Sequence, residues 1–198
     1  MSQDTGMNDR EVESGGMKIS AYSQQVIDQF LQERYNVGKG IIRAFAPRIV
    51  LPAANVDWLR ASQPARVLQE IAAAAEGLVS WTEDLAQQVN DHCNDIDGLI
   101  FSGWDEVPDV MMWAWWQTGV GQIVLRARVW AARDELISLT QASEMTGLAL
   151  SALSNMIARG RLLLIRDLRE PNPTKASRVR LSDVRDLQAR DRNADDEL

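Results

Sequence analysis

The sequence predicts a mainly α protein, with an N-terminal antiparallel helical bundle and a small C-terminal module that contains a β-hairpin. Three observations predict it. Apolar residues recur every three or four positions over long stretches before residue 137, as in amphipathic helices. Two short helical segments around a glycine follow at 139–162. Charged and apolar residues then alternate at 178–181, as in a half-buried strand. Long amphipathic helices bury their apolar faces best against one another.

Charge is divided unevenly along the 198 residues, whose net charge is −7. Residues 1–137 carry 11 basic and 19 acidic side chains, whereas residues 138–190 carry 9 and 5 and residues 191–198 carry 1 and 4. We expect a disordered acidic tail over 1–19, a helical bundle for dimerisation or interaction over 20–137, a basic module over 138–190 and an acidic tail over 191–198. The acidity of the whole chain therefore does not exclude nucleic-acid binding by the module.

The first predicted helix covers residues 21–35, which place apolar side chains on one face. Gly38 and Gly40 predict that the chain then becomes less regular. Pro47 and Pro52 enclose a loop or a short extended piece.

The second predicted helix is long and begins at Ser62, with Pro64 in its first turn. Apolar positions follow in steps of three and four from Leu68 to Ile96, a heptad stripe typical of a long bundle helix or a coiled coil. Gly77 lies inside this stripe at a modest cost to helix stability.

The third predicted helix covers residues 109–135 and starts after Pro108. Gly119 and Gly121 predict a kink or the close approach of a neighbouring helix. Three tryptophans fall within four residues here, and three indoles so placed do not all face one core. We consider an interface and a large bundle interior as equal alternatives for them. The interface candidates are Trp113, Trp115 and Trp116.

The module begins with two short helices. Thr140 is expected to cap the first, which ends at Gly147 in a left-handed conformation. The second covers residues 151–159 and ends at Gly160. A turn of a few residues that contains glycine is what a helix-turn-helix unit requires. The small core is expected to consist of Ala142, Met145, Leu148, Leu153 and Ile157.

A β-hairpin is predicted next. Residues 162–168 are short and apolar, "EPNPTKAS" is rich in turn-forming residues, and residues 178–181 alternate. Lys175 is expected near the tip of this hairpin. Ser182 is expected to cap a last helix over 183–190.

The order of elements in "LTQASEMTGLALSALSNMIARGRL" and "RVRLSDV" resembles the winged helix-turn-helix of the MerR and excisionase type, over residues 137–190. The resemblance implies a second helix in the DNA major groove and a hairpin, or wing, on the neighbouring backbone or minor groove. By position it implies DNA contacts from Leu150, Ser151, Ser154, Asn155 and Arg159 in the helix, from Arg161 near the backbone, and from Lys175, Ser177, Arg178 and Arg180 in the wing.

Two positions depart from the pattern of that family. Ala149 stands where a polar cap is usual, and Leu150 where a polar or basic residue is frequent. Asn155 is the one side chain of the second helix suited to reading adenine bidentately. Arginine and lysine at the remaining positions suit phosphates. Residues 1–137 resemble no family.

We therefore expect a DNA-binding protein, with transcriptional regulation as its role, that acts on double-stranded DNA as a homodimer formed through its N-terminal helices. Two alternatives stay open. One is an excisionase-like recombination accessory factor that uses the same module. The other is an adaptor whose acidic helical body binds a protein partner.

Enzymatic, metal and membrane functions find little support. The segment 91–98, "DHCNDIDG", fails as a calcium loop because Cys93 and Trp104 occupy the first and twelfth positions of the frame. His92 and Cys93 alone supply too few zinc ligands. The most apolar run, residues 110–116, is too short to cross a bilayer. A single cysteine suits a reducing compartment, so we expect a cytoplasmic protein. A single histidine supports no Ser-His-Asp or Cys-His arrangement, so we expect no enzymatic activity and no cofactor.

Overall fold

The computed structural model describes residues 18–46, 55–167 and 172–195, together with residues 48, 50, 52, 53 and 170. These residues form ten helices and one three-stranded antiparallel sheet, which confirms the mainly α prediction. The predicted N-terminal tail lies outside the described residues up to residue 17. Among the described residues, no helix combines the length and apolar character needed to cross a membrane.

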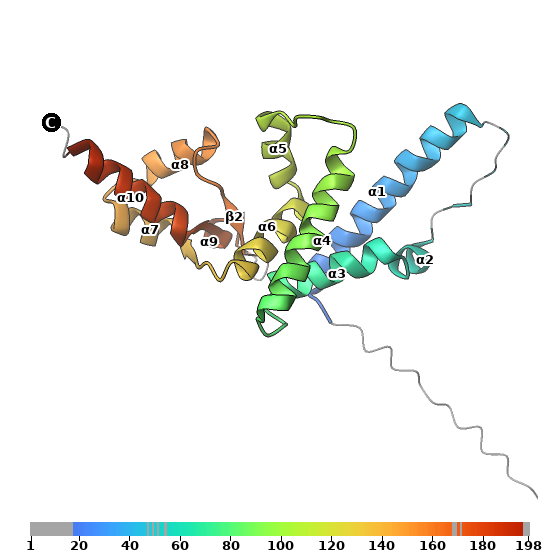
Figure 1. Ribbon diagram of the computed structural model, residues 1–198, viewed down its shortest axis with the longest axis horizontal. Helices are drawn as coiled ribbons and strands as arrows, with labels where there is room; N and C mark the ends of the chain where they lie inside the picture. The colour runs from blue at the N-terminus through green and yellow to red at the C-terminus, as the bar shows by residue number, and fades with distance from the viewer. Residues whose placement is uncertain are drawn as a thin grey trace, which may run out of the picture.

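The described residues of the N-terminal body from 18 to 135 form helices and the segments between them (Figure 1). These are α1 (Ala21–Phe45), α2 (Val56–Arg60), α3 (Gln63–Ala75), α4 (Glu83–Phe101), α5 (Asp109–Trp116) and α6 (Gly119–Ala131). Helix α6 is the centre of the body, since it contacts α1, α3, α4 and α5 and most of its residues are buried. The body core is therefore built around one short helix.

Helix α1 is ten residues longer than predicted. Ser20 caps it, and the carboxylate of Glu76 accepts hydrogen bonds from the Ser20 and Ser23 hydroxyls at 2.6 and 2.5 Å. Gly38 and Gly40 lie within the helix and do not interrupt it, because a glycine costs only about 1 kcal/mol there. Tyr35 near the middle of α1 packs edge-on against Trp58 of α2, and the C-terminal end of α1 stands away from the other helices (Figure 1).

The predicted long helix over 62–96 is wrong, because the structure has two helices there. The start at Ser62 is confirmed: its hydroxyl caps α3. Gly77 adopts φ 69°, a left-handed conformation that ends α3. Thr82, which falls within the predicted stripe, caps α4. The apolar stripe continues through this turn without a change of spacing, so periodicity alone does not reveal the break.

The predicted helix over 109–135 is likewise two helices, α5 and α6. Gln117 ends α5 and Thr118 caps α6, with the Thr118 hydroxyl accepting a hydrogen bond from the Gly121 N–H at 3.0 Å. A Cβ atom on Gly121 would lie 2.1 Å from the Trp115 carbonyl oxygen, so this tight turn requires glycine. Gly119 packs closely against Val26 of α1, which is the close approach of a neighbouring helix that the glycines suggested.

The C-terminal module combines short helices with the sheet. Its elements are β1 (Leu136–Ser138), α7 (Leu139–Thr146), α8 (Leu150–Ala158), β2 (Ile165–Arg166), α9 (Pro173–Ala176), β3 (Ser177–Arg180) and α10 (Leu181–Asp195). The strand order is β1-β3-β2, with Ile137 opposite Val179 and Ile165 opposite Arg178. The predicted pairing of residues 162–168 with 178–181 is present but shorter, and β1 was not predicted.

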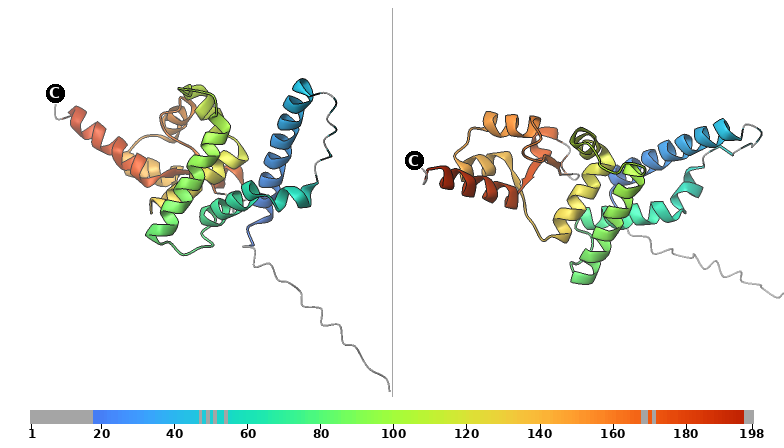
Figure 2. Two further views of the ribbon diagram at one scale, coloured as in Figure 1. Left: turned by 45° about the vertical axis from the view of Figure 1, so that its right-hand side comes forward. Right: turned by 45° about the horizontal axis from the view of Figure 1, so that its top comes forward.

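The last helix differs from its prediction at both ends. It starts at Leu181, so Ser182 lies in its first turn and donates its hydroxyl to Asp134 at 2.5 Å, with no capping role. It continues to Asp195, into the segment predicted as an acidic tail from residue 191. The module joins the body beside α6 in both views of Figure 2.

Candidate nucleic-acid interface

Helix α7 is fixed at both ends by local hydrogen bonds. Ser138 and Gln141 form a capping box: the Gln141 N–H donates to the Ser138 hydroxyl at 3.2 Å, and the Ser138 N–H donates to the Gln141 side chain at 2.9 Å. The cap is therefore Ser138, which corrects the prediction of Thr140. Gly147 has φ 73°, which confirms the predicted left-handed end.

The turn from α7 to α8 is tied to α7 by two side chains. The Ser143 hydroxyl donates to the Leu148 carbonyl at 2.6 Å, and the Leu148 N–H donates to the Thr146 hydroxyl at 3.3 Å. Helix α8 has no side-chain cap at Ala149. The direction of α8 is thus set by the turn before it and by the core beneath it.

A small core lies under α7 and α8. It consists of Ile137, Ala142, Leu153, Leu162, Val179 and Val184, with Leu148, Met156 and Ile157 packed partly against it. Met145 was predicted in this core but is 36% exposed. Strands β1 and β3 and helices α7, α8 and α10 contribute to this core, whereas Ile165 of β2 packs against Leu125 and Val129 of α6.

The predicted reading face of α8 is exposed and lies on one side of the helix. Its members follow one another at helical spacing, which brings their side chains together. They are Leu150, Ser151, Ser154, Asn155 and Arg159. Leu150 is 49% exposed, so the face offers one apolar and several polar contacts.

Arg159 and Arg161 are exposed at the end of α8. Neither forms an ion pair within the part of the chain that the structure describes. Arg161 lines a hollow of about 240 Å³ together with the carboxylates of Asp183 and Asp186. Arg159, the C-cap of α8, lines a cavity that Asp109 also lines, so each of the two arginines shares a hollow with an acidic residue.

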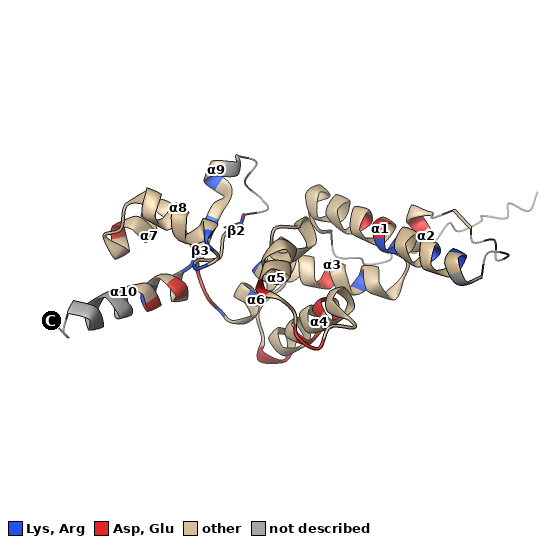
Figure 3. Ribbon diagram, turned by 90° about the horizontal axis from the view of Figure 1, so that it is seen from above, with Lys and Arg blue, Asp and Glu red and all other residues tan. Residues whose placement is uncertain are grey.

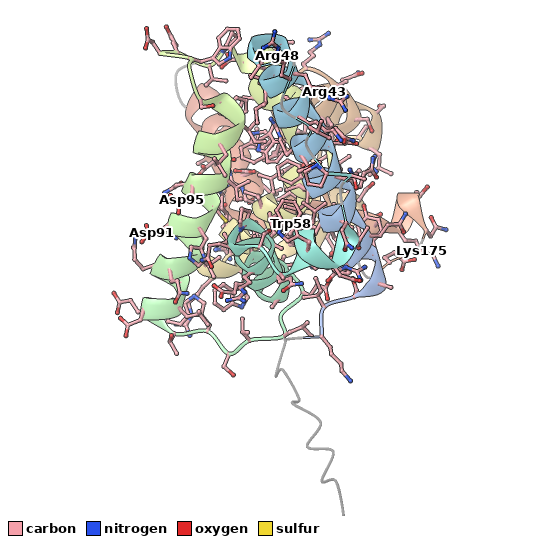
Figure 4. The ribbon with its side chains drawn as sticks, turned by 90° about the vertical axis from the view of Figure 1, so that its right-hand side faces the viewer. Arg43, Arg48, Trp58, Asp91, Asp95 and Lys175 are labelled. Atoms are coloured by element: carbon pink, nitrogen blue, oxygen red, sulfur yellow. The ribbon has the colours of Figure 1, made fainter. Side chains whose placement is uncertain are left out.

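The wing consists of β2, β3 and the short helix α9 between them. Lys175 of α9 is exposed and lies at the edge of the molecule (Figure 4). Ser177 is half-buried. Arg178 is also half-buried, and its guanidinium donates to the carbonyls of Lys175 and Ser177. Lys175 is thus the most available of the predicted wing contacts.

Arg180 was predicted as a DNA contact, but its guanidinium is occupied. Two of its nitrogens donate to the Asp183 carboxylate at 3.0 and 2.6 Å. These hydrogen bonds, which oppose partial burial, raise the pKa of Arg180 above its ordinary value. In this arrangement Arg180 holds β3 to the first turn of α10.

Arg166 is a cation that the sequence prediction missed. It is exposed in β2, directly opposite Ser177 of β3. Figure 3 shows Lys and Arg on β2, β3 and α9, and acidic residues on the first turns of α10. The signal available in the sequence was a charged residue directly after the apolar run "LLLI".

Two buried polar residues of α6 hold the base of the wing. The Gln122 amide donates to the Leu164 carbonyl at 3.2 Å and accepts from the Arg166 N–H at 2.6 Å. Arg126 donates to the Arg166 carbonyl at 3.3 Å and lies 3.5 Å from the Asp167 carboxylate. The backbone of β2 is therefore hydrogen-bonded to the body on both sides of Ile165.

The three tryptophans occupy different environments. Trp115 is 6% exposed and donates its indole N–H to Asp97 at 2.9 Å, so it is a core residue and not an interface candidate. Trp113 and Trp116 line a cavity of about 600 Å³ between α5 and the end of α8. There Trp113 lies next to Gly160, so the interface it faces is one within the chain.

Residues that could bind metal are not grouped. No three or more His, Cys, Asp or Glu side chains gather at one point among the described residues. Cys93 is buried, and burial raises the pKa of its thiol to about 12. A thiol so protonated is a weak nucleophile and a weak metal ligand.

Comparison with known proteins gives no relative. The sequence matches no protein-family model, no curated protein and no solved structure.

Proposed function

We propose that the protein binds double-stranded DNA through residues 138–190, acting as a winged helix-turn-helix in a transcriptional regulator. The observation that carries the proposal is the exposed face of α8. It presents Ser151, Ser154 and Asn155 beside Arg159, which has no ion pair among the described residues, with Lys175 and Arg166 on the adjacent hairpin.

The roles follow from residue chemistry. Asn155 is able to donate and accept across an adenine edge in the major groove, and Leu150 offers apolar contact to a thymine methyl group. Arg159 and Lys175 are placed to contact phosphates, which position the helix without reading sequence. Arg180, held by Asp183, contributes to the fold of the wing. With one cysteine, and that one buried, we place the protein in the cytoplasm.

Binding of the full chain to a pool of random duplexes at two salt concentrations tests the proposal. The double variant Arg159→Ala/Lys175→Ala should weaken binding and lower the slope of log affinity against log salt by about two. The matched control is Lys18→Ala/Arg66→Ala, which removes two exposed positive charges from the body. That control should leave both quantities unchanged.

Two results would overturn the proposal. One is the absence of measurable binding at low salt. The other is an equal effect of the two double variants, because binding would then follow total charge and not this surface. In either case the better hypothesis is that the acidic helical body binds a protein partner.

A further inference from the structure

The second half of α1 carries exposed apolar side chains on one face. Val37 is 56% exposed and Ile41, one turn later, is 55% exposed. Residues four apart lie on the same side of a helix. An apolar stripe of this kind, on the end of a helix that projects from the body in Figure 1, is typical of an interaction surface.

The same face of α1 forms one wall of a groove in its first half. The groove has a volume of about 560 Å³, and its other wall is the junction of α5 and α6. Val26, Phe30 and Val37 line it from α1, and Trp115 and Val120 line it from the other wall. Val37 belongs to both, so the stripe and the groove are continuous, and the apolar walls of the groove are only partly covered by the body core.

We propose that a second copy of this chain docks on this face, with the two α1 helices antiparallel. A two-fold axis between residues 33 and 34 places Val26 opposite Ile41 of the second copy. It also places Phe30 opposite Val37 of the second copy. The projecting half of each helix then fills the groove of the other, and every contact occurs twice, as two-fold symmetry requires.

The charges at the centre of the stripe fit this pairing. The same axis places Glu33 opposite Arg34 of the second copy. Both side chains are exposed and line the groove. Glu33 accepts a hydrogen bond from Gln29 at 2.9 Å, and Arg34 lies over the Phe30 ring at 5.3 Å. Neither has an ion pair within the described part of the chain. Opposite charges that meet only in the antiparallel register favour a second copy over an unrelated partner.

This proposal does not depend on DNA binding, since the surface lies on α1 and not on the module. If both proposals hold, the dimer carries two modules, and its preferred site in DNA is an inverted repeat. The experiments distinguish failure of the dimer proposal from failure of the DNA-binding proposal. Sedimentation is measured without DNA, and a monomer remains able to bind a half-site.

Sedimentation equilibrium of the full chain at micromolar concentrations tests the surface. We expect a dimer, and we expect Ile41→Glu to be a monomer over the same concentrations. The matched control is Leu99→Glu on α4, because Leu99 is 60% exposed and the substitution makes the same chemical change elsewhere. Circular dichroism should show unchanged helix content in both variants. A monomeric wild type, or equal effects of the two variants, would overturn the proposal.

Exchange of the central charges tests the register. Glu33→Arg and Arg34→Glu should each weaken the dimer about tenfold, because each brings like charges together twice. The double variant Glu33→Arg/Arg34→Glu should restore the wild-type dissociation constant to within about threefold, since the pair is then merely reversed. A double variant as weak as the single variants would rule out the antiparallel pairing.

Discussion

The arginines of helix α6 and Arg159 of the module differ in what they contact. In α6, Arg126 is 7% exposed and bonds the Ala75 and Arg166 carbonyls. Its neighbour Arg128 binds Asp97 at 2.8 Å. In the module, Arg159 is exposed and has no ion pair among the described residues. The difference teaches that the net charge of a segment does not show how many of its charges are exposed: the arginines of α6 bond groups of the fold, whereas Arg159 is exposed to solvent.

The strongest test of this comparison is Arg126→Leu. The substitution removes a buried donor shared by two carbonyls and a carboxylate, so we expect the free energy of unfolding to fall by about 3 kcal/mol. Arg161→Leu, the control in the module, should change it by less than about 0.5 kcal/mol. Chemical denaturation followed by circular dichroism measures both. Equal losses would show that the two groups of arginines do not differ.

A second test compares two serines within the module. Ser138→Ala removes the capping box of α7 and should cost about 1 kcal/mol of stability. Ser154→Ala alters the exposed face of α8 and should leave stability nearly unchanged, while it affects DNA affinity if that face reads bases. Thermal unfolding and duplex binding of both variants provide the readouts. If Ser154→Ala lowered the unfolding temperature as much as Ser138→Ala, Ser154 would be a residue that stabilises the fold.

Local signals in the sequence predicted the parts of the fold that depend on neighbouring residues. Ser62 as a helix start and Gly147 as a helix end need only a cap or a left-handed glycine, and both were identified. The end of α3 at Gly77 was missed, because the apolar spacing continues across the turn. Strand β1 was missed because it has three residues and pairs with β3, which follows some forty residues later.

The candidate site shows the same division. Exposure of Ser151 and Asn155 follows from helical periodicity, which the sequence displays. The engagement of Arg180 by Asp183 depends on how β3 meets α10, and the sequence leaves that angle open. The contacts of Gln122 are backbone groups of β2, and backbone acceptors carry no sequence signal. Polar contacts that depend on how two elements meet, or on backbone acceptors, are therefore the part that required the structure.

A third test asks whether Arg180 belongs with the arginines that serve the fold. Arg180→Gln removes its two hydrogen bonds to Asp183, and at a half-exposed site this should cost about 0.5 kcal/mol of stability. The salt dependence of DNA binding should stay unchanged. Arg159→Gln should do the opposite, leaving stability unchanged and lowering the salt slope by about one. A lowered slope for Arg180→Gln would return Arg180 to the DNA contacts.

The smallest expected effect concerns the exposed pair of Arg60 with Asp28, at 2.5 Å. The hydrogen bond from Arg60 lowers the pKa of Asp28 below 3.8, with burial opposing it. An acid with a lowered pKa stabilises the folded state above its ordinary pKa, and this stabilisation is lost as pH falls through the lowered value. The stability difference between wild type and Asp28→Asn should therefore shrink below about pH 4.

Asp97 supplies the control of opposite sign. Burial raises its pKa above 3.8, although Arg128 and the Trp115 indole oppose the shift. The folded state then holds this proton more tightly than the unfolded state, so stability falls as pH rises from 3.8 through the raised value. Relative to Asp97→Asn, wild type should gain stability on acidification, whereas relative to Asp28→Asn it should lose it. Denaturation midpoints between pH 3 and pH 6 distinguish the two. If the two stability differences changed with pH in the same direction, the pKa values of Asp28 and Asp97 would not be shifted in opposite directions.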